Sequence, residues 1–141
     1  MTRHASTART EDSRSTRDLV LDIAERLFAE KGFAGVSMRA ISAEAGLRNQ
    51  ASLYHHFRHK RALYEAVMAR GIGRLVDLVT ESGSSADVLD RVIDFLAERP
   101  HLPRLIQRVA LDDHRHLGKT VSHLLSPLYE HGVRVLAAMG G

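Results

Sequence analysis

Apolar residues recur at helical spacing along most of this chain, and this periodicity limits the possible folds more than any other feature. The first stripe contains Leu19, Val20, Ile23, Ala24, Leu27 and Phe28. A stripe with this spacing covers one face of an amphipathic helix. No segment alternates apolar and polar residues between turn signals, as a half-buried strand would. The sequence therefore predicts an all-α fold.

Capping residues and helix breakers divide the pattern into seven segments. The predicted helices cover about residues 17–31, 38–45, 49–57, 62–79, 86–98, 102–112 and 118–139. Ser37 and Asn49 are the expected N-caps of the second and third helices, because their side chains accept hydrogen bonds from backbone N–H groups. Gly32 and Gly46 are expected to end the helices before them.

Three regions follow from this division. Residues 1–16 are rich in Ser, Thr and Arg and poor in apolar side chains, so we expect a disordered arm. Residues 17–61 form a three-helix domain, and residues 62–141 form a second helical domain. Gly71 and Gly73 weaken the fourth helix, and they mark either a bend or a close contact with another helix.

The composition excludes several classes of protein. Of the 141 residues, 44% are hydrophobic and 26% are charged, which is typical of a globular chain. The absence of cysteine excludes disulfides and thiolate metal sites. No apolar run approaches the roughly 20 residues of a membrane helix, and the N-terminus lacks the apolar core of a signal peptide. We therefore expect a soluble, cytoplasmic protein with no membrane partner.

Positive charge is concentrated in the first part of the chain. Residues 1–61 carry 11 basic and 7 acidic residues, whereas residues 62–141 carry 9 basic and 10 acidic residues. The segment 46–61 holds four basic residues, three histidines and no acid. This distribution suits contact with a phosphate backbone, although a solvated surface loop would look the same.

The second and third predicted helices form a helix-turn-helix candidate. In that motif the second helix lies in the major groove, where each base pair presents a distinct pattern of donors and acceptors. Its first turn would carry Asn49, Gln50 and Ser52, whose short polar side chains suit base edges. Leu53 and Phe57 lie four residues apart and would form its buried face.

These segments resemble the N-terminal DNA-binding domain of the TetR family of transcriptional regulators. The resemblance rests on FAEKGF, on GVSMRAISAEAGL and on ASLYHHFRHKRALYEAV, and it covers about residues 17–68. The run Leu53-Tyr54-His55-His56-Phe57, followed by Lys60, matches the family pattern residue for residue. One departure is that six residues separate Gly46 from Leu53 where the family pattern has five, which lengthens the turn at residues 47–48.

The resemblance implies a DNA-binding role for ten residues. Ser37 and Arg39 would contact the DNA backbone, Tyr54 and His56 would hold phosphates, and Lys60 would grip a phosphate at the start of the fourth helix. The reading surface would comprise Asn49, Gln50, Ala51 and Ser52, with His55 beside it. Plainer interpretations stay open: packing for Tyr54, ordinary surface positions for the histidines, and solvated charges for Arg39 and Lys60.

The second helical domain would, by the same resemblance, bind a small effector and form a homodimer. An effector pocket between helices is mostly apolar. Its candidate lining residues, each of which can equally belong to the core, are Leu89, Val92, Ile93, Phe95, Leu96, Leu105, Ile106, Val109, Leu124, Leu125 and Tyr129. Family members carry further helices that form most of the dimer interface. We therefore expect either a truncated chain or a short member that dimerises through other helices.

The sequence gives little support for an enzyme or for a metal-binding protein. The chain has no GxSxG, Walker, GxGxxG or HExxH motif. His114 and His116 lie two residues apart, which is poor spacing for two ligands on one helix face. We therefore expect no catalytic residues, no cofactor and no metal site. The hypothesis is a repressor that leaves a pseudo-palindromic operator when a small molecule binds. The alternatives are a helical interaction module without DNA binding and, with less support, an all-α enzyme.

Overall fold

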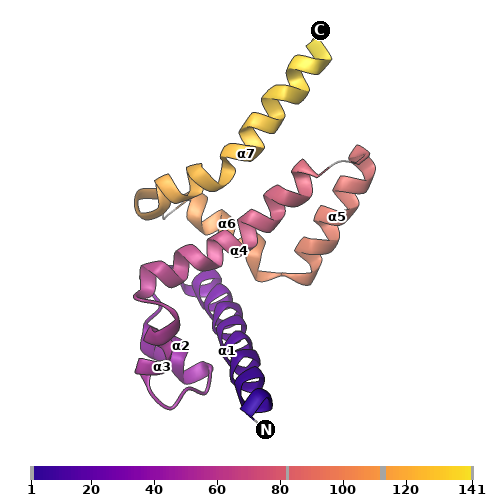
Figure 1. Cartoon of the computed structure of the whole chain (residues 1–141). Coiled ribbons are helices and arrows are strands. Elements are labelled where there is room, and N and C mark those ends of the chain that lie inside the picture. The colour runs from indigo at the N-terminus through magenta and orange to yellow at the C-terminus, as the bar shows by residue number, and fades with distance from the viewer. Residues whose placement is uncertain (1, 82, 112–113, 141) are drawn as a thin grey trace. The chain divides into compact units, whose positions relative to one another are not determined.

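The computed structural model describes the backbone of residues 2–81, 83–111 and 114–140, and most side chains from Thr16 onward. Every regular element in these ranges is a helix, which confirms the predicted all-α class (Figure 1). The helices are α1 (Thr2–Lys31), α2 (Met38–Glu44), α3 (Gln50–His56), α4 (Lys60–Thr80), α5 (Ser85–Glu98), α6 (His101–Leu111) and α7 (His114–Gly140). None of them, over the residues described, is long and apolar enough to cross a membrane.

Local capping explains where the short helices begin and end. The Ser37 hydroxyl oxygen accepts a hydrogen bond from the Ala40 backbone N–H at 3.0 Å, and Asn49 Oδ1 accepts one from the Ser52 N–H at 3.1 Å. Both predicted N-caps are therefore confirmed. Gly32 and Gly46 follow α1 and α2 with φ angles of 77° and 70°, a left-handed conformation that glycine adopts without strain.

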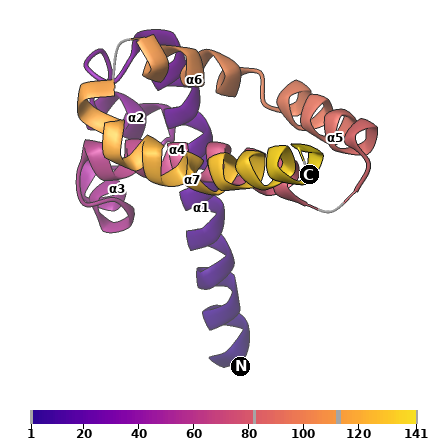
Figure 2. The same ribbon diagram turned by 90° about the horizontal axis from the view of Figure 1, so that it is seen from above.

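Helix α1 is longer than the sequence predicted. It begins at Thr2 rather than near residue 17, so most of the segment expected to be a disordered arm is helical (Figure 2). Residues 2–16 contain no proline or glycine. Once the buried stretch after residue 17 has formed a helix, each further residue adds one hydrogen bond without a new nucleation step. Propagation toward the N-terminus therefore overcomes the lack of apolar side chains.

The boundaries of the later helices differ less from the predicted ones. Helix α7 starts at His114 rather than near residue 118, so residues 114–116 of the predicted polar bend are already helical, and residues 112–113 lie outside the described residues. Pro127 lies inside α7. Gly71 packs closely against the Leu102 side chain, while Gly73 has no neighbour within 4 Å of a notional Cβ. Gly71 therefore marks a close contact with another helix, the second of the two interpretations.

The chain divides into two compact units, Met1–Val67 and Met68–Gly141. The predicted three-helix domain, residues 17–61, lies within the first unit, which also takes in the start of α4. In that unit α2 packs against both α1 and α3 (Figure 1). Its buried apolar residues include Val20, Ala24, Leu27, Phe28, Ile41, Leu53, Phe57, Leu63 and Tyr64. The ring of Tyr64 contacts those of Phe28 and Phe33, with centroids 4.7 and 5.1 Å apart.

The second unit contains the rest of α4 together with α5, α6 and α7. Its buried apolar residues come from α4 and α6: Met68, Ile72, Val76, Leu78, Leu102, Leu105 and Val109. Helices α6 and α7 pack against each other. Large apolar side chains of α5 and α7 remain exposed, among them Leu89 at 58% and Tyr129 at 76%. Among the side chains that the structure describes, α5 and α7 therefore bury fewer large apolar residues than α4 and α6 do.

Candidate nucleic-acid interface

The turn between α2 and α3 is held by backbone and side-chain hydrogen bonds. The Leu47 N–H donates to the Ser42 carbonyl at 3.1 Å, and the Gly46 N–H donates to the Ala43 carbonyl at 3.2 Å. Ser42 is buried, and its hydroxyl donates to the Asn49 carbonyl at 3.4 Å. One buried serine thus contacts both ends of the turn.

Helix α3 separates its buried and exposed residues cleanly. Leu53 is fully buried and Phe57, its C-cap, is 4% exposed, as the four-residue spacing predicted. The exposed side carries Asn49, Gln50, Ala51, Ser52, Tyr54 and His55. The six residues that the sequence placed on or beside the reading surface are therefore all accessible.

Asn49 and Ser52 are linked to each other within this face. Asn49 Oδ1 accepts hydrogen bonds from the Ser52 backbone N–H and from the Ser52 hydroxyl at 3.4 Å. The first turn is thereby held in place, and the oxygen of Asn49 is engaged before any ligand arrives. Gln50 and Ala51 project from the same turn and are exposed.

Helix α2 contributes Ser37 and Arg39 at its N-terminal end. Both residues are exposed. Because the Ser37 oxygen already accepts the Ala40 N–H, its contact with a DNA backbone would be made through the hydroxyl proton. Arg39 lies in the first turn of α2, where a guanidinium is accessible to a phosphate.

His56 lies at the C-terminal end of α3 beside a cation that the sequence did not single out. Arg17 Nη1 donates to the His56 carbonyl at 3.5 Å, and the Arg17 guanidinium lies 4.6 Å from the centroid of the Phe57 ring. Burial of the ring lowers the pKa of His56 below 6.5, and the nearby charges of His55 and Arg17 lower it further. His56 is therefore neutral at pH 7 in the free protein.

Lys60, the first residue of α4, lies at the start of the fourth helix as expected, and its side chain contacts the chain's own backbone. Its Nζ donates to the Phe33 carbonyl at 2.7 Å and to the Val36 carbonyl at 3.0 Å. The same ammonium lies 4.1 Å from the centroid of the Phe33 ring. Lys60 is half-buried, and two of its three N–H groups point at the chain's own backbone.

Sequence reasoning missed two further contacts in this unit. His59 Nδ1 accepts a hydrogen bond from the Ala62 backbone N–H at 3.0 Å, so this histidine caps α4. Arg26 forms an ion pair with Glu44, which joins α1 to the end of α2. Neither contact has a local signature except the position of His59 just before a helix. Among the side chains that the structure describes, no three His, Asp or Glu residues form a metal-binding group.

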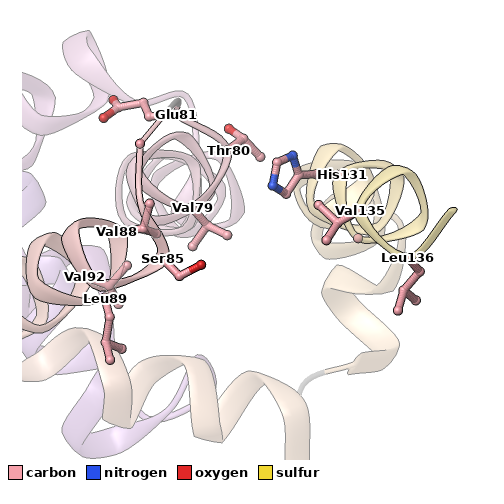
Figure 3. A pocket seen from close by; sticks show the side chains of 12 residues that line it. Val79, Thr80, Glu81, Ser85, Val88, Leu89, Val92, His131, Val135 and Leu136 are labelled. Atoms are coloured by element: carbon pink, nitrogen blue, oxygen red, sulfur yellow. The ribbon is translucent and has the colours of Figure 1, made fainter. Parts of the chain in front are cut away.

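The second unit contains a cavity of about 860 Å³ between the end of α4, the start of α5 and the C-terminal half of α7 (Figure 3). Its lining comprises Val79, Thr80, Glu81, Gly83, Ser85, Val88, Leu89, Val92, His131, Gly132, Val135 and Leu136. Of the predicted pocket residues, Leu89 and Val92 line it, whereas Leu105 and Val109 are buried elsewhere in α6. The cavity is thus mostly apolar with a few polar groups.

Comparison with known proteins identifies the first unit. Residues 20–67 match the family "Bacterial regulatory proteins, tetR family". The HTH-type transcriptional repressor AcnR of Corynebacterium diphtheriae is 27% identical over 96 residues, which cover 64% of this chain and 50% of that protein. The HTH-type transcriptional regulator UidR of Escherichia coli K12 is 28% identical over 90 residues, or 64% of this chain and 45% of the relative.

A solved structure extends the similarity of fold beyond the first unit. A transcriptional regulator of the TerR/AcrR family from Aquifex aeolicus VF5 superposes with a TM-score of 0.65 at 20% identity, covering 82% of this chain and 70% of its own. At that identity the similarity establishes the fold. The chain spans at most half the length of the two relatives described above. Over residues 20–67, the helix-turn-helix part of this chain is thus similar to the tetR family of bacterial regulatory proteins.

Proposed function

We propose that the protein is a sequence-specific DNA-binding regulator of transcription that inserts α3 into the major groove. The observation that carries this proposal is the division of α3, in which the polar residues of the first turn are exposed while Leu53 and Phe57 are buried. A short helix anchored in this way presents a fixed set of side chains to base edges. The names of the relatives AcnR and UidR, a repressor and a regulator, support repression as the mode of action.

The exposed residues divide into two roles. Gln50 and Ser52 offer hydrogen-bonding groups to base edges, and Ala51 offers a methyl group suited to the methyl of thymine. Asn49 shares the same turn. The phosphate backbone would be contacted by residues around that turn, namely Ser37, Arg39, Tyr54, His55 and His56. Such contacts position the helix but carry no sequence information directly.

The partners form part of the same proposal. A homodimer would place two copies of α3 in successive major grooves, about 34–36 Å apart, on a pseudo-palindromic operator. The cavity in the second unit would take a small and mainly apolar effector, and the polar residues of its lining include Thr80, Glu81 and His131. The family match points to a regulator rather than an enzyme, and a regulator of this kind acts in the cytoplasm, where bacterial DNA lies.

Selection of bound DNA from a random pool tests the proposal directly. We expect enrichment of a sequence with two similar half-sites whose centres lie about one helical turn apart. Gln50→Ala should relax the preference at one position of each half-site, while Tyr129→Ala in the second unit should leave the selected sequence unchanged. If the protein enriches no sequence, DNA reading is not its function.

A salt titration separates the proposal from a helical interaction module that has lost DNA binding. The logarithm of the association constant should fall linearly with the logarithm of salt concentration, with a slope of about −0.9 for each phosphate neutralised. Arg39→Ala should reduce that slope, and Arg104→Ala, an exposed arginine of α6, is the matched control. Weak binding without salt dependence would favour the interaction module.

A further inference from the structure

The Lys60 side chain turns back from the first residue of α4 toward the loop that joins α1 to α2. Its Nζ donates to two carbonyls of that loop, Phe33 at 2.7 Å and Val36 at 3.0 Å. The loop carbonyls and the ring of Phe33, 4.1 Å from Nζ at its centroid, surround the ammonium. A lysine committed to these contacts has one N–H group left for a phosphate.

The loop carbonyls need such a donor. They lie just beyond the C-terminus of α1, where the helix dipole is negative. Val36, one of the two acceptor residues, is only 4% exposed, whereas Ala34 and Gly35 before it are exposed. A buried carbonyl without a hydrogen bond destabilises the folded state, and a cation at this end of α1 offsets both effects.

The loop leads directly into the DNA-facing helices. Val36 precedes Ser37, the N-cap of α2, and α2 packs against α3. The ring of Phe33 also contacts that of Tyr64, one turn further along α4. Lys60 and Tyr64 therefore hold the loop against the first turns of α4, and the position of the loop determines where α2 begins.

We propose that Lys60 is a positioning residue for operator binding, which fixes the α1–α2 loop on α4 and thereby sets how α2 and α3 face the DNA, instead of neutralising a phosphate. This inference rests on the DNA-binding function proposed above. On this proposal, the contribution of Lys60 to DNA affinity is independent of salt concentration. The contributions of Arg39 and the other residues expected to contact the DNA backbone depend on salt.

The test compares Lys60→Met with Arg58→Met in the complete chain, using a DNA duplex obtained by selection with the wild-type protein. Methionine keeps an unbranched side chain but removes the ammonium. Arg58 is exposed and lies two residues away, so its substitution removes the same charge without affecting the loop. We expect Lys60→Met to weaken operator binding about tenfold at every salt concentration. Its salt slope should match that of the wild-type protein.

A phosphate contact would give the opposite pattern. Lys60→Met would then flatten the salt slope by about 0.9 for each phosphate that is no longer neutralised, relative to the wild-type protein, and would weaken specific and non-specific binding equally. That result would overturn the proposal. Lys60→Arg is the second variant, because arginine retains the charge and is a strong phosphate ligand. Positioning predicts weaker operator binding at an unchanged slope, whereas a phosphate contact predicts wild-type affinity.

Hydrogen exchange in the absence of DNA provides a readout that does not depend on the proposed function. The amides of Ala40 and Ile41 donate to the side chain and carbonyl of Ser37. Both amides should exchange faster in Lys60→Met than in Arg58→Met if Lys60 fixes the start of α2. Equal exchange in the two variants would show that Lys60 does not brace this loop. If the wild-type protein selects no DNA, the proposed function fails, and the exchange experiment still decides the bracing role.

Discussion

The two units of this chain are both helical. They differ because individual residues of the first unit have specific structural roles, whereas large apolar residues of the second unit are exposed. In the first unit, Ser37 and Asn49 cap helices, Leu53 is fully buried, and Lys60 holds a loop. In the second unit, α5 and α7 expose large apolar side chains such as Leu89 and Leu136, at 58% and 69%. Where a structural role requires one residue type at one position, the sequence shows a short and specific motif. Elsewhere, apolar residues at helical spacing are sufficient to form a helix. The family match covers residues 20–67, which lie in the first unit.

The largest expected effect tests the packing of α3. Leu53→Ala removes a fully buried side chain and should lower the free energy of unfolding of the first unit by about 2–5 kcal/mol. Leu89→Ala, at a site that is 58% exposed in the second unit, should change it by less than about 0.5 kcal/mol. Urea denaturation followed by circular dichroism measures both. Equal effects would mean that the two units are packed alike.

The next prediction tests whether the second unit also contains a position at which only glycine fits without displacing a neighbour. A Cβ at position 71 would overlap the Leu102 side chain, so Gly71→Ala should destabilise the protein by about 1–3 kcal/mol. Gly73→Ala is the matched control, because it meets nothing within 4 Å and should stabilise α4 by up to about 1 kcal/mol. Thermal unfolding distinguishes them. A neutral Gly71→Ala would show that α4 and α6 do not approach this closely.

A smaller effect compares equivalent caps in the two units. Ser37 caps α2, and Ser84 caps α5 by accepting the Asp87 N–H at 3.2 Å. Replacing either residue with alanine should cost about 1 kcal/mol of stability. Ser37→Ala should in addition weaken operator binding, while Ser84→Ala should not. Loss of operator affinity in both variants would indicate that the DNA-binding unit depends on α5.

The smallest expected effect is the pH dependence due to His56. Its pKa lies below 6.5 in the free folded protein, so the unfolded chain binds more protons near that pH. The stability contribution of neutral His56 is therefore complete above about pH 6.5 and is lost as pH falls through the lowered pKa. A phosphate beside the ring would raise the pKa in the complex, because it favours the charged form. Operator affinity should then increase as pH falls from about 7.5 to 5.5.

Two variants separate His56 from other titrating groups. In binding measurements at constant ionic strength, His56→Gln should remove most of the increase in affinity at low pH. His131→Gln, which alters a residue of the cavity in the second unit, should retain it. An unchanged pH profile in His56→Gln would exclude a phosphate contact by this histidine.

The sequence by itself determined the helical class, the starts of α2 and α3, and the buried face formed by Leu53 and Phe57. These features are local, because a cap and its partner lie within three residues and the two apolar residues lie one turn apart. The same reasoning misplaced the start of α1, because propagation from a stable helix depends on the packed segment that follows and not on the composition of residues 2–16.

Only the tertiary structure decided the partners of the charged side chains and the lining of the cavity. Lys60 lies 27 residues from Phe33, and Arg17 lies 39 residues from His56. Contacts over such separations depend on how the chain closes on itself, which neither motif nor periodicity specifies. The apolar pattern of the second unit likewise shows that its helices pack, but many arrangements satisfy the same pattern. The physical reason is that capping and helix formation act over a few residues, whereas charge pairing and cavities depend on the complete packing of a unit.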